Sequence, residues 1–292
     1  MTRSLLLVST IVCAVAACSG GYSTPGAGAT PAPATPVAAA PAPNGKALQL
    51  LPGTMRYLVY QDVHIQQDYT GLPPTIDLRY GLYLTATIAA PTDSLGYPTT
   101  FTVDSIKVDS GIQIPPQINL AAARGYRVSG RLSPTGEFTN PVPSDTGAAA
   151  SLGNLLPRFR SFFPRLPVGG VRPGDTWTDS TTATDSPGGT TITSRSLNHR
   201  TATTWEDHGG VRALRLEGTG TYTFSGAGEQ GGAPFTIAGS GTGTGWQLLA
   251  IDGRYLGGEA RDSTTLTIDL PMQGITIPRR QLARTTVTAL PR

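Results

Sequence analysis

Long runs in which polar and apolar residues alternate are the feature that most restricts how this chain of 292 residues can fold. The clearest runs cover residues 211–224, 235–251, 255–270 and 275–290, and they exceed the usual strand length of about 5–6 residues. Alternation with a period of two is typical of β-strands that bury one face. The sequence therefore predicts a mainly β fold. Its long antiparallel strands would form a curved sheet, a half-barrel or an open barrel.

Further strands are predicted in both halves of the chain. They cover residues 55–60 with a continuation to 69, 76–88, 101–108, 125–132, 175–184 and 190–205. A faint internal repeat accompanies them, because residues 132–138 align with residues 249–255. Each segment has a strand, a turn with a glycine suited to positive φ, and an aromatic residue that starts the next strand. Duplication and convergence on common hairpin chemistry both explain this repeat.

A segment between the two halves has the apolar spacing of a helix. Its apolar residues recur three or four positions apart and are Leu152, Leu155, Leu156, Phe159, Phe162 and Phe163. This spacing predicts a central amphipathic helix over 147–163, kinked or split at Pro157, that packs on the sheet. The helix would join halves of about 47–145 and 170–292 within one β domain of 47–292. A movable lid over an apolar cavity and a basic, membrane-facing helix are the alternatives.

The N-terminus has the pattern of a signal peptide over residues 1–17. Arg3 precedes an apolar run that is shorter than the roughly 20 residues needed to span a bilayer. The run Val15-Ala16-Ala17-Cys18 resembles the lipobox of bacterial lipoproteins. This resemblance implies cleavage before Cys18 and acylation of its thiol, so Cys18 would anchor the chain to a membrane. An ordinary secretory signal with a chance cysteine is the alternative.

Residues 18–46 predict a disordered tether after the lipidated cysteine. They are rich in Gly, Ser, Thr, Ala and Pro, and such a segment cannot bury enough apolar surface to fold. As a coil it would span about 30 Å. Cys13 is the other cysteine and lies in the signal peptide, so the mature chain would hold no disulfide. By resemblance to enterobacterial lipoproteins, Ser19 after the cysteine favours the outer membrane of the cell envelope.

Charge and motif content argue against several functional classes. The formal net charge is +3 and only 14% of residues are charged, with no basic cluster of the kind that binds nucleic acid. The histidines His64, His199 and His208 are isolated, so no zinc spacing or catalytic triad is indicated. We therefore predict a protein that is not an enzyme and uses no metal or cofactor. A hydrolase with paired carboxylates is the least favoured alternative.

Glycines alternate along two neighbouring predicted strands. They are Gly218 and Gly220 on the earlier strand, and Gly239, Gly241, Gly243 and Gly245 on the later one. A hairpin around 226–232 that pairs Gly220 with Gly239 and Gly218 with Gly241 would create a patch of bare backbone. A bulky group is expected to approach such a patch: the Phe-rich helix, aromatic residues from the far wall, or a ligand. Packing by the protein itself is favoured over a ligand.

The stretch that joins the halves carries a resemblance to known proteins. Phe163-Pro164-Arg165-Leu166-Pro167 is followed by Val171-Arg172-Pro173-Gly174-Asp175-Thr176-Trp177. It resembles a motif of uncharacterised bacterial envelope lipoproteins, in which Gly-Asp-x-Trp begins the second half of the β domain. The wider architecture is similar to lipoprotein carriers of the LolA, LolB and LppX type. That similarity implies a half-barrel whose hollow holds acyl chains.

The expected function is that of a non-enzymatic envelope lipoprotein that binds a lipid or other hydrophobic ligand in the hollow of its sheet. The candidate ligand contacts are Leu155, Phe159, Phe162, Phe163, Trp177, Gly241 and Gly243. The alternative is a structural or interaction lipoprotein that docks an envelope protein partner and has no ligand cavity.

Overall fold

The computed structural model describes residues 47–69, 73–91, 93, 96–109, 120–152, 155–156, 159–185, 190–230 and 233–291. The predicted signal peptide, Cys18 and the tether lie outside the described residues, so their expectations stay predictions.

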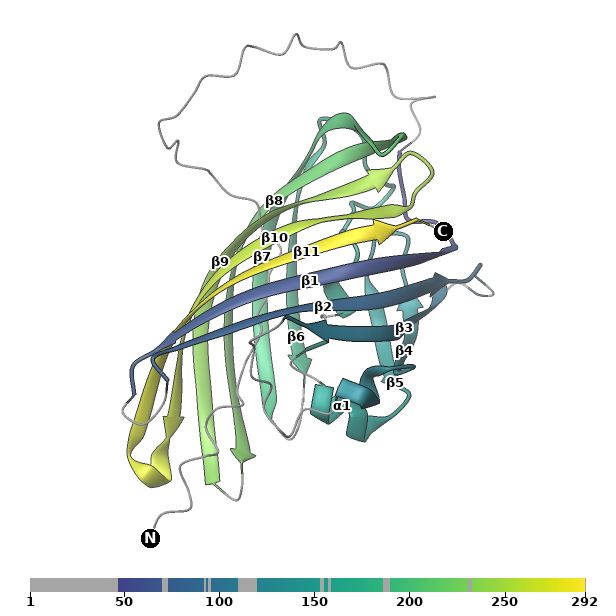
Figure 1. Cartoon of the computed structure of the whole chain (residues 1–292). Helices are drawn as coiled ribbons and strands as arrows, with labels where there is room; N and C mark the ends of the chain where they lie inside the picture. Colours follow the sequence, from purple (N-terminus) through teal and green to yellow (C-terminus); the bar gives the residue numbers. More distant parts are fainter. Residues whose placement is uncertain are drawn as a thin grey trace.

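The β domain consists of eleven antiparallel strands in a single sheet (Figure 1). The strands are β1(Gly53–Gln67), β2(Thr75–Ile88), β3(Tyr97–Val108), β4(Arg127–Leu132), β5(Phe138–Pro143), β6(Thr176–Asp185), β7(Thr191–His208), β8(Val211–Gln230), β9(Ala233–Ala250), β10(Tyr255–Leu270) and β11(Ile275–Leu290). The predicted mainly β class and its long antiparallel strands are confirmed.

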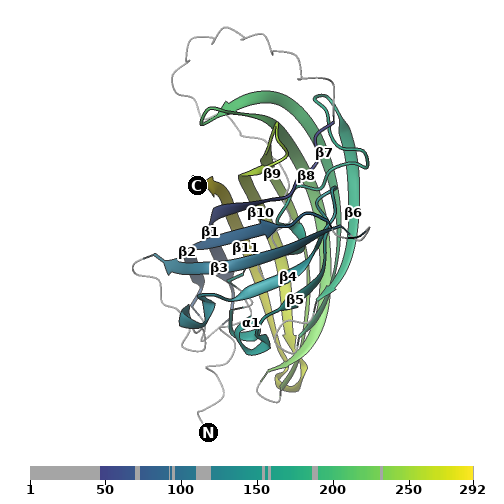
Figure 2. The ribbon, with the colours of Figure 1, turned by 90° about the vertical axis from the view of Figure 1, so that its right-hand side faces the viewer.

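The order of the strands divides the sheet into two meanders. β1–β5 form one, β6–β11 form the other, and β1 pairs with β11 in the middle of the sheet. β5 and β6 are consecutive in the chain but lie at opposite edges. The sheet bends strongly without closing, so it has a concave and a convex face (Figure 2). Each strand therefore sends alternate side chains into the hollow.

The chain between β5 and β6 crosses the concave side because it must connect the two edges. It contains the short helix α1(Thr146–Leu152) and the 3-10 helix η4(Phe159–Ser161), which is one turn long. The prediction of a central helix over 147–163 is therefore wrong. Gly153 follows α1 directly and Pro157 comes four residues later, and both residue types disfavour a continuing helix.

The crossing segment nevertheless buries its apolar residues as expected. Leu152, Leu155, Phe162 and Phe163 are buried, whereas Leu156 and Phe159 are partly buried against the same core. An aromatic cluster forms around Phe101, whose ring centroid lies 4.8 Å from that of Phe159 and 5.2 Å from those of Phe138 and Phe162. The chain's own side chains thus pack together at this end of the hollow, which we call the plug end.

The two segments of the internal repeat form matching turns. Ser133 donates its N–H to the Glu137 carbonyl, and Ala250 donates to the Arg254 carbonyl, each over 2.8 Å. The turn glycines, Gly136 and Gly253, have φ values of +87° and +79°. The expected turn chemistry is therefore confirmed at both places.

The register of the glycine-rich hairpin differs from the prediction by four residues. Gly220 pairs with Gly243, and Gly218 pairs with Gly245. The connection between the two strands is shorter than the predicted one around 226–232. Pairing continues to Gln230 and Ala233, and this shorter connection shifts the register. Side chains of the neighbouring strand β8 cover two of the glycines on β9. A Cβ on Gly241 would overlap the Tyr222 ring, and a Cβ on Gly239 would overlap the Phe224 ring. The expected protein packing is thus present, supplied by a neighbouring strand.

Candidate binding site in the concave face

Polar residues and glycines cross the concave face between two apolar clusters. The first cluster is the core at the plug end, and the second contains Tyr222, Phe224, Ile237 and Ile268 near the opposite end of the sheet. The strip between them, which we call the polar belt, runs over β6–β11. It comprises Asp179, Asn198, Arg200, Gln247, Asp262, Thr264 and Gln281, with Gly218, Gly220 and Gly243 among them.

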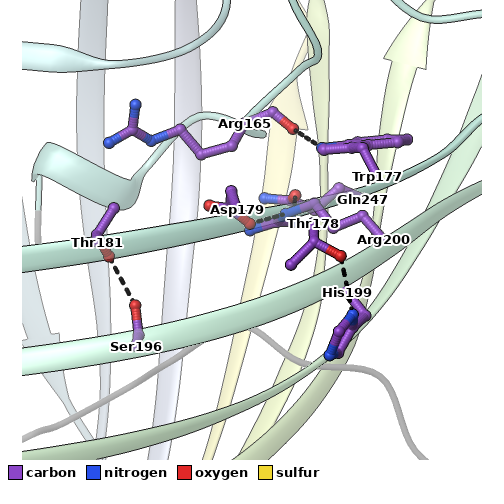
Figure 3. A network of polar contacts seen from close by, with 9 residues as sticks. All are labelled: Arg165, Trp177, Thr178, Asp179, Thr181, Ser196, His199, Arg200 and Gln247. Carbon is purple, nitrogen blue, oxygen red and sulfur yellow. Dashed lines mark hydrogen bonds and ion pairs between the residues drawn. The ribbon is translucent and has the colours of Figure 1, made fainter.

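Arg200 forms the centre of the belt's best-defined network (Figure 3). Its Nε lies 3.4 Å from Asp179 Oδ1 on β6, and its NH1 group donates to Gln247 Oε1 on β9 over 3.1 Å. The Arg200 side chain is only 10% exposed. A charge this deeply buried needs an ion-pair or hydrogen-bond partner. Asp179 and Gln247 supply those partners and hold the guanidinium flat on the sheet.

Glycines on β8 make room for the side chains of β7. Arg200 pairs with Gly218, and its Cγ lies 3.4 Å from the position that a Cβ on Gly218 would take. Asn198 pairs with Gly220, and a Cβ there would overlap Asn198 Oδ1. The long polar side chains of β7 therefore lie over bare backbone of β8, and at Gly220 a Cβ would displace the Asn198 amide.

Two amide groups in the belt have unused hydrogen-bonding capacity. Asn198 is 7% exposed, and its side chain forms no hydrogen bond to the part of the chain that the structure describes. Gln247 is 6% exposed, and within the same residues its amide NH2 group also has no acceptor. Neither amide is among the described polar atoms that are fully buried without a hydrogen-bond partner, so both keep contact with the open hollow. The belt is therefore where the concave face offers polar groups to a further molecule.

The belt continues toward the centre of the sheet through more buried polar groups. Tyr222 and Thr264 share a hydrogen bond between their hydroxyl groups. Tyr80 donates to Gln61 Oε1 over 2.9 Å, and burial raises the pKa of the Tyr80 hydroxyl well above its usual value. Gln281 Nε2 is buried with no hydrogen-bond partner among the described residues. These polar groups lie beside a small apolar cluster of Val63, Ile65 and Ala283, which pairs with Asp262 and Gln281 at the centre of the sheet.

The residues expected to contact a hydrophobic ligand fall into two separate groups. Leu155, Phe162 and Phe163 are buried in the core at the plug end, where Phe159 and Trp177 pack against them partly buried. Gly243 lies on β9 within the polar belt, and Gly241 is two residues before it on the same strand. The structure therefore does not bring the whole predicted set together.

The Gly-Asp-x-Trp stretch fastens the crossing segment to β6. Gly174 has a φ of +88°, and Asp175 Oδ2 accepts a hydrogen bond of 2.7 Å from the backbone N–H of Arg172. Trp177 donates its indole N–H to the Arg165 carbonyl over 3.1 Å (Figure 3). These contacts give the motif a structural role, because they fix the path of the chain where β6 begins.

The histidines lie apart from the belt. His64 and His199 are on the convex face, where they contact Asp77 at 2.7 Å and Thr178 at 3.0 Å, and His208 ends β7 in an exposed position. No group of three or more His, Cys, Asp or Glu residues suited to a metal occurs among the described residues. Within those residues there is also no helix with the length and apolar character to cross a bilayer.

Comparison with protein-family models, curated proteins and solved structures gave no match to this chain.

Proposed function

We propose that this chain is a non-enzymatic binding lipoprotein of the bacterial cell envelope, anchored through Cys18, with a ligand site in the hollow of its sheet. The polar belt carries the proposal, because the amide NH2 groups of Asn198 and Gln247 form no hydrogen bond there to the described residues. The sequence favoured a hydrophobic ligand held near Phe162 and Phe163. Because those rings pack on Tyr57, Phe101 and each other, the belt is the better-supported site.

The anchor is tested by replacing Cys18 with serine in the full-length chain. Serine has no thiol that could be acylated. We therefore expect the protein to move from the membrane fraction to the soluble fraction and to lose incorporation of a labelled fatty acid. Stable membrane binding needs more than one acyl chain. Because the substitution removes the whole anchor, the loss of membrane association should be large. Cys13→Ser is the matched control, because that residue would leave with the signal peptide. Equal membrane association of the two variants would refute the anchor.

The ligand site is tested by native mass spectrometry of the full-length chain purified from a bacterial host. We expect a bound small molecule in the wild-type protein and its loss in Asn198→Leu. The leucine side chain has the same branched arrangement of heavy atoms as asparagine but offers no hydrogen bond. Thermal unfolding should change little, because Asn198 forms no hydrogen bond within the described residues. Retention of the same mass by the variant would place the ligand elsewhere.

Docking of an envelope protein is a second candidate function, and an observation on the sheet edges favours it. β5 has six residues and contains Pro141 and Pro143, which lack the N–H needed to pair with another strand. β6 has ten residues without proline or lysine and forms the other edge. An unprotected edge can pair with an extended segment of another protein. Docking becomes the favoured function if no small molecule accompanies the purified chain.

A further inference from the structure

The belt's free groups indicate the chemistry of its ligand, an inference that rests on the proposed function. Asn198 offers both an acceptor and a donor, because its carbonyl and its NH2 group form no hydrogen bond within the described residues. Gln247 offers its NH2 group, since its Oε1 already accepts from Arg200. A ligand that satisfies this set must both donate and accept hydrogen bonds at neighbouring positions.

The charges around these amides argue against an ionic ligand. Arg200 is the belt's cation next to them, and Asp179 compensates it at 3.4 Å. In the strand register Asp179 lies opposite Asn198, and Asp262 lies opposite Gly243 on the other side of the glycines. An anion would therefore meet the Asp179 carboxylate, and a cation would meet Arg200. A neutral polar molecule avoids both repulsions.

Further groups along β6 and β7 also fit hydroxyl groups. Thr181 and Ser196 share a hydrogen bond of 2.6 Å on the rung next to Asp179 and Asn198, and both are partly exposed. Trp177 lies opposite Arg200 in the register and is partly exposed, so an aromatic ring stands beside the polar groups (Figure 3). Aromatic rings pack against apolar faces of a ligand while polar side chains fix its orientation.

We propose that the belt over Gly218 and Gly220 binds a neutral polyhydroxyl ligand, such as the sugar units of an envelope glycan. Each sugar hydroxyl donates and accepts, as the free amide groups of Asn198 and Gln247 require. The side chains of Asn198 and Arg200 lie over these glycines, so the ligand would meet their polar groups above the sheet. The partly exposed residues of β6 place its entry at that edge, since Gln247 on β9 is buried whereas Asp179 and Thr181 on β6 are half-buried.

The test uses isothermal titration of the full-length chain in detergent with defined probes. The neutral probes are maltotriose and triacetylchitotriose, the anionic probe is glucose 6-phosphate, and the apolar probe is decanol. We expect binding of a neutral saccharide, and Asn198→Leu and Gln247→Leu should each weaken it about tenfold, as the loss of one or two buried hydrogen bonds predicts. Gln66→Leu is the matched control, because that amide is exposed on the convex face, and it should leave the affinity unchanged.

The outcomes separate the ligand class from the proposed function. Binding of the anionic or apolar probe that is lost in Asn198→Leu would overturn the polyhydroxyl class and leave the ligand site standing. No site-dependent binding of any probe, together with a native mass that shows no bound molecule, would mean that ordered water alone satisfies the amides. Both the class and the ligand site would then fall. Equal weakening by Gln66→Leu would also overturn the proposal.

Discussion

Replacing Gly136 with alanine is expected to lower the free energy of unfolding by about 3 kcal/mol, because two costs add. The residue has a φ of +87°, and this left-handed conformation costs a residue with a Cβ about 1–2 kcal/mol. The new Cβ would also overlap the backbone oxygen of Pro164 in the crossing segment. Backbone atoms cannot rotate away as a side chain can, so we expect a further cost of about 1–3 kcal/mol from overpacking.

Gly174→Ala separates these two costs. Gly174 has nearly the same φ, +88°, but nothing lies within 4 Å of the position of its Cβ. This control should therefore lose only the conformational part, about 1–2 kcal/mol. Urea denaturation measures both variants in the full-length chain. Equal losses would show that the β4–β5 turn does not press against the crossing segment, and that the plug end is packed more loosely than the contacts indicate.

The strands could be predicted from the sequence because alternation is a local signal. Runs such as 255–270 and 275–290 coincide with the bounds of β10 and β11. One face of each of these strands is buried, and a shift by one residue would turn its apolar side chains toward solvent. The order of the strands was not accessible in this way, because the central pairing of β1 with β11 joins segments far apart in the chain.

The central helix shows where a periodic signal misleads. The spacing of Leu152, Leu155, Phe159 and Phe162 fits a helix, yet the structure buries Leu155 and Phe162 through a turn and a 3-10 segment. Short segments gain little from helix formation alone. Packing against the concave face decides which side chains are buried here, so the pattern predicted the burial correctly but not the helix.

The belt residues could not be predicted because the sequence does not show which face of their strand is buried. On β7 the apolar Leu197 is 43% exposed, whereas its polar neighbour Asn198 is 7% exposed. The signal that identifies Asn198 and Arg200 is their position opposite Gly220 and Gly218. That signal exists only once the register between β7 and β8 is known. A four-residue error in the hairpin register was enough to misplace the glycines relative to their partners.

Replacing Phe101 with alanine is expected to lower the free energy of unfolding by about 3–5 kcal/mol. Phe101 is fully buried, and its ring contacts those of Phe138, Phe159, Phe162 and Phe163 at centroid distances of 4.8–5.6 Å. Removing it takes one ring from the middle of the cluster and leaves a cavity that β3, β5 and the crossing segment cannot fill without moving. Urea denaturation of the full-length chain measures the loss.

Val142→Ala on β5 is the control, because this side chain is 64% exposed and should change the stability by less than about 0.5 kcal/mol. A loss in Phe101→Ala as small as that of the control would mean that the aromatic residues line an open hollow. The hypothesis of a hydrophobic ligand at the plug end would then be favoured. A loss of the expected size would mean that these rings form a packed core that holds the crossing segment against β3 and β5.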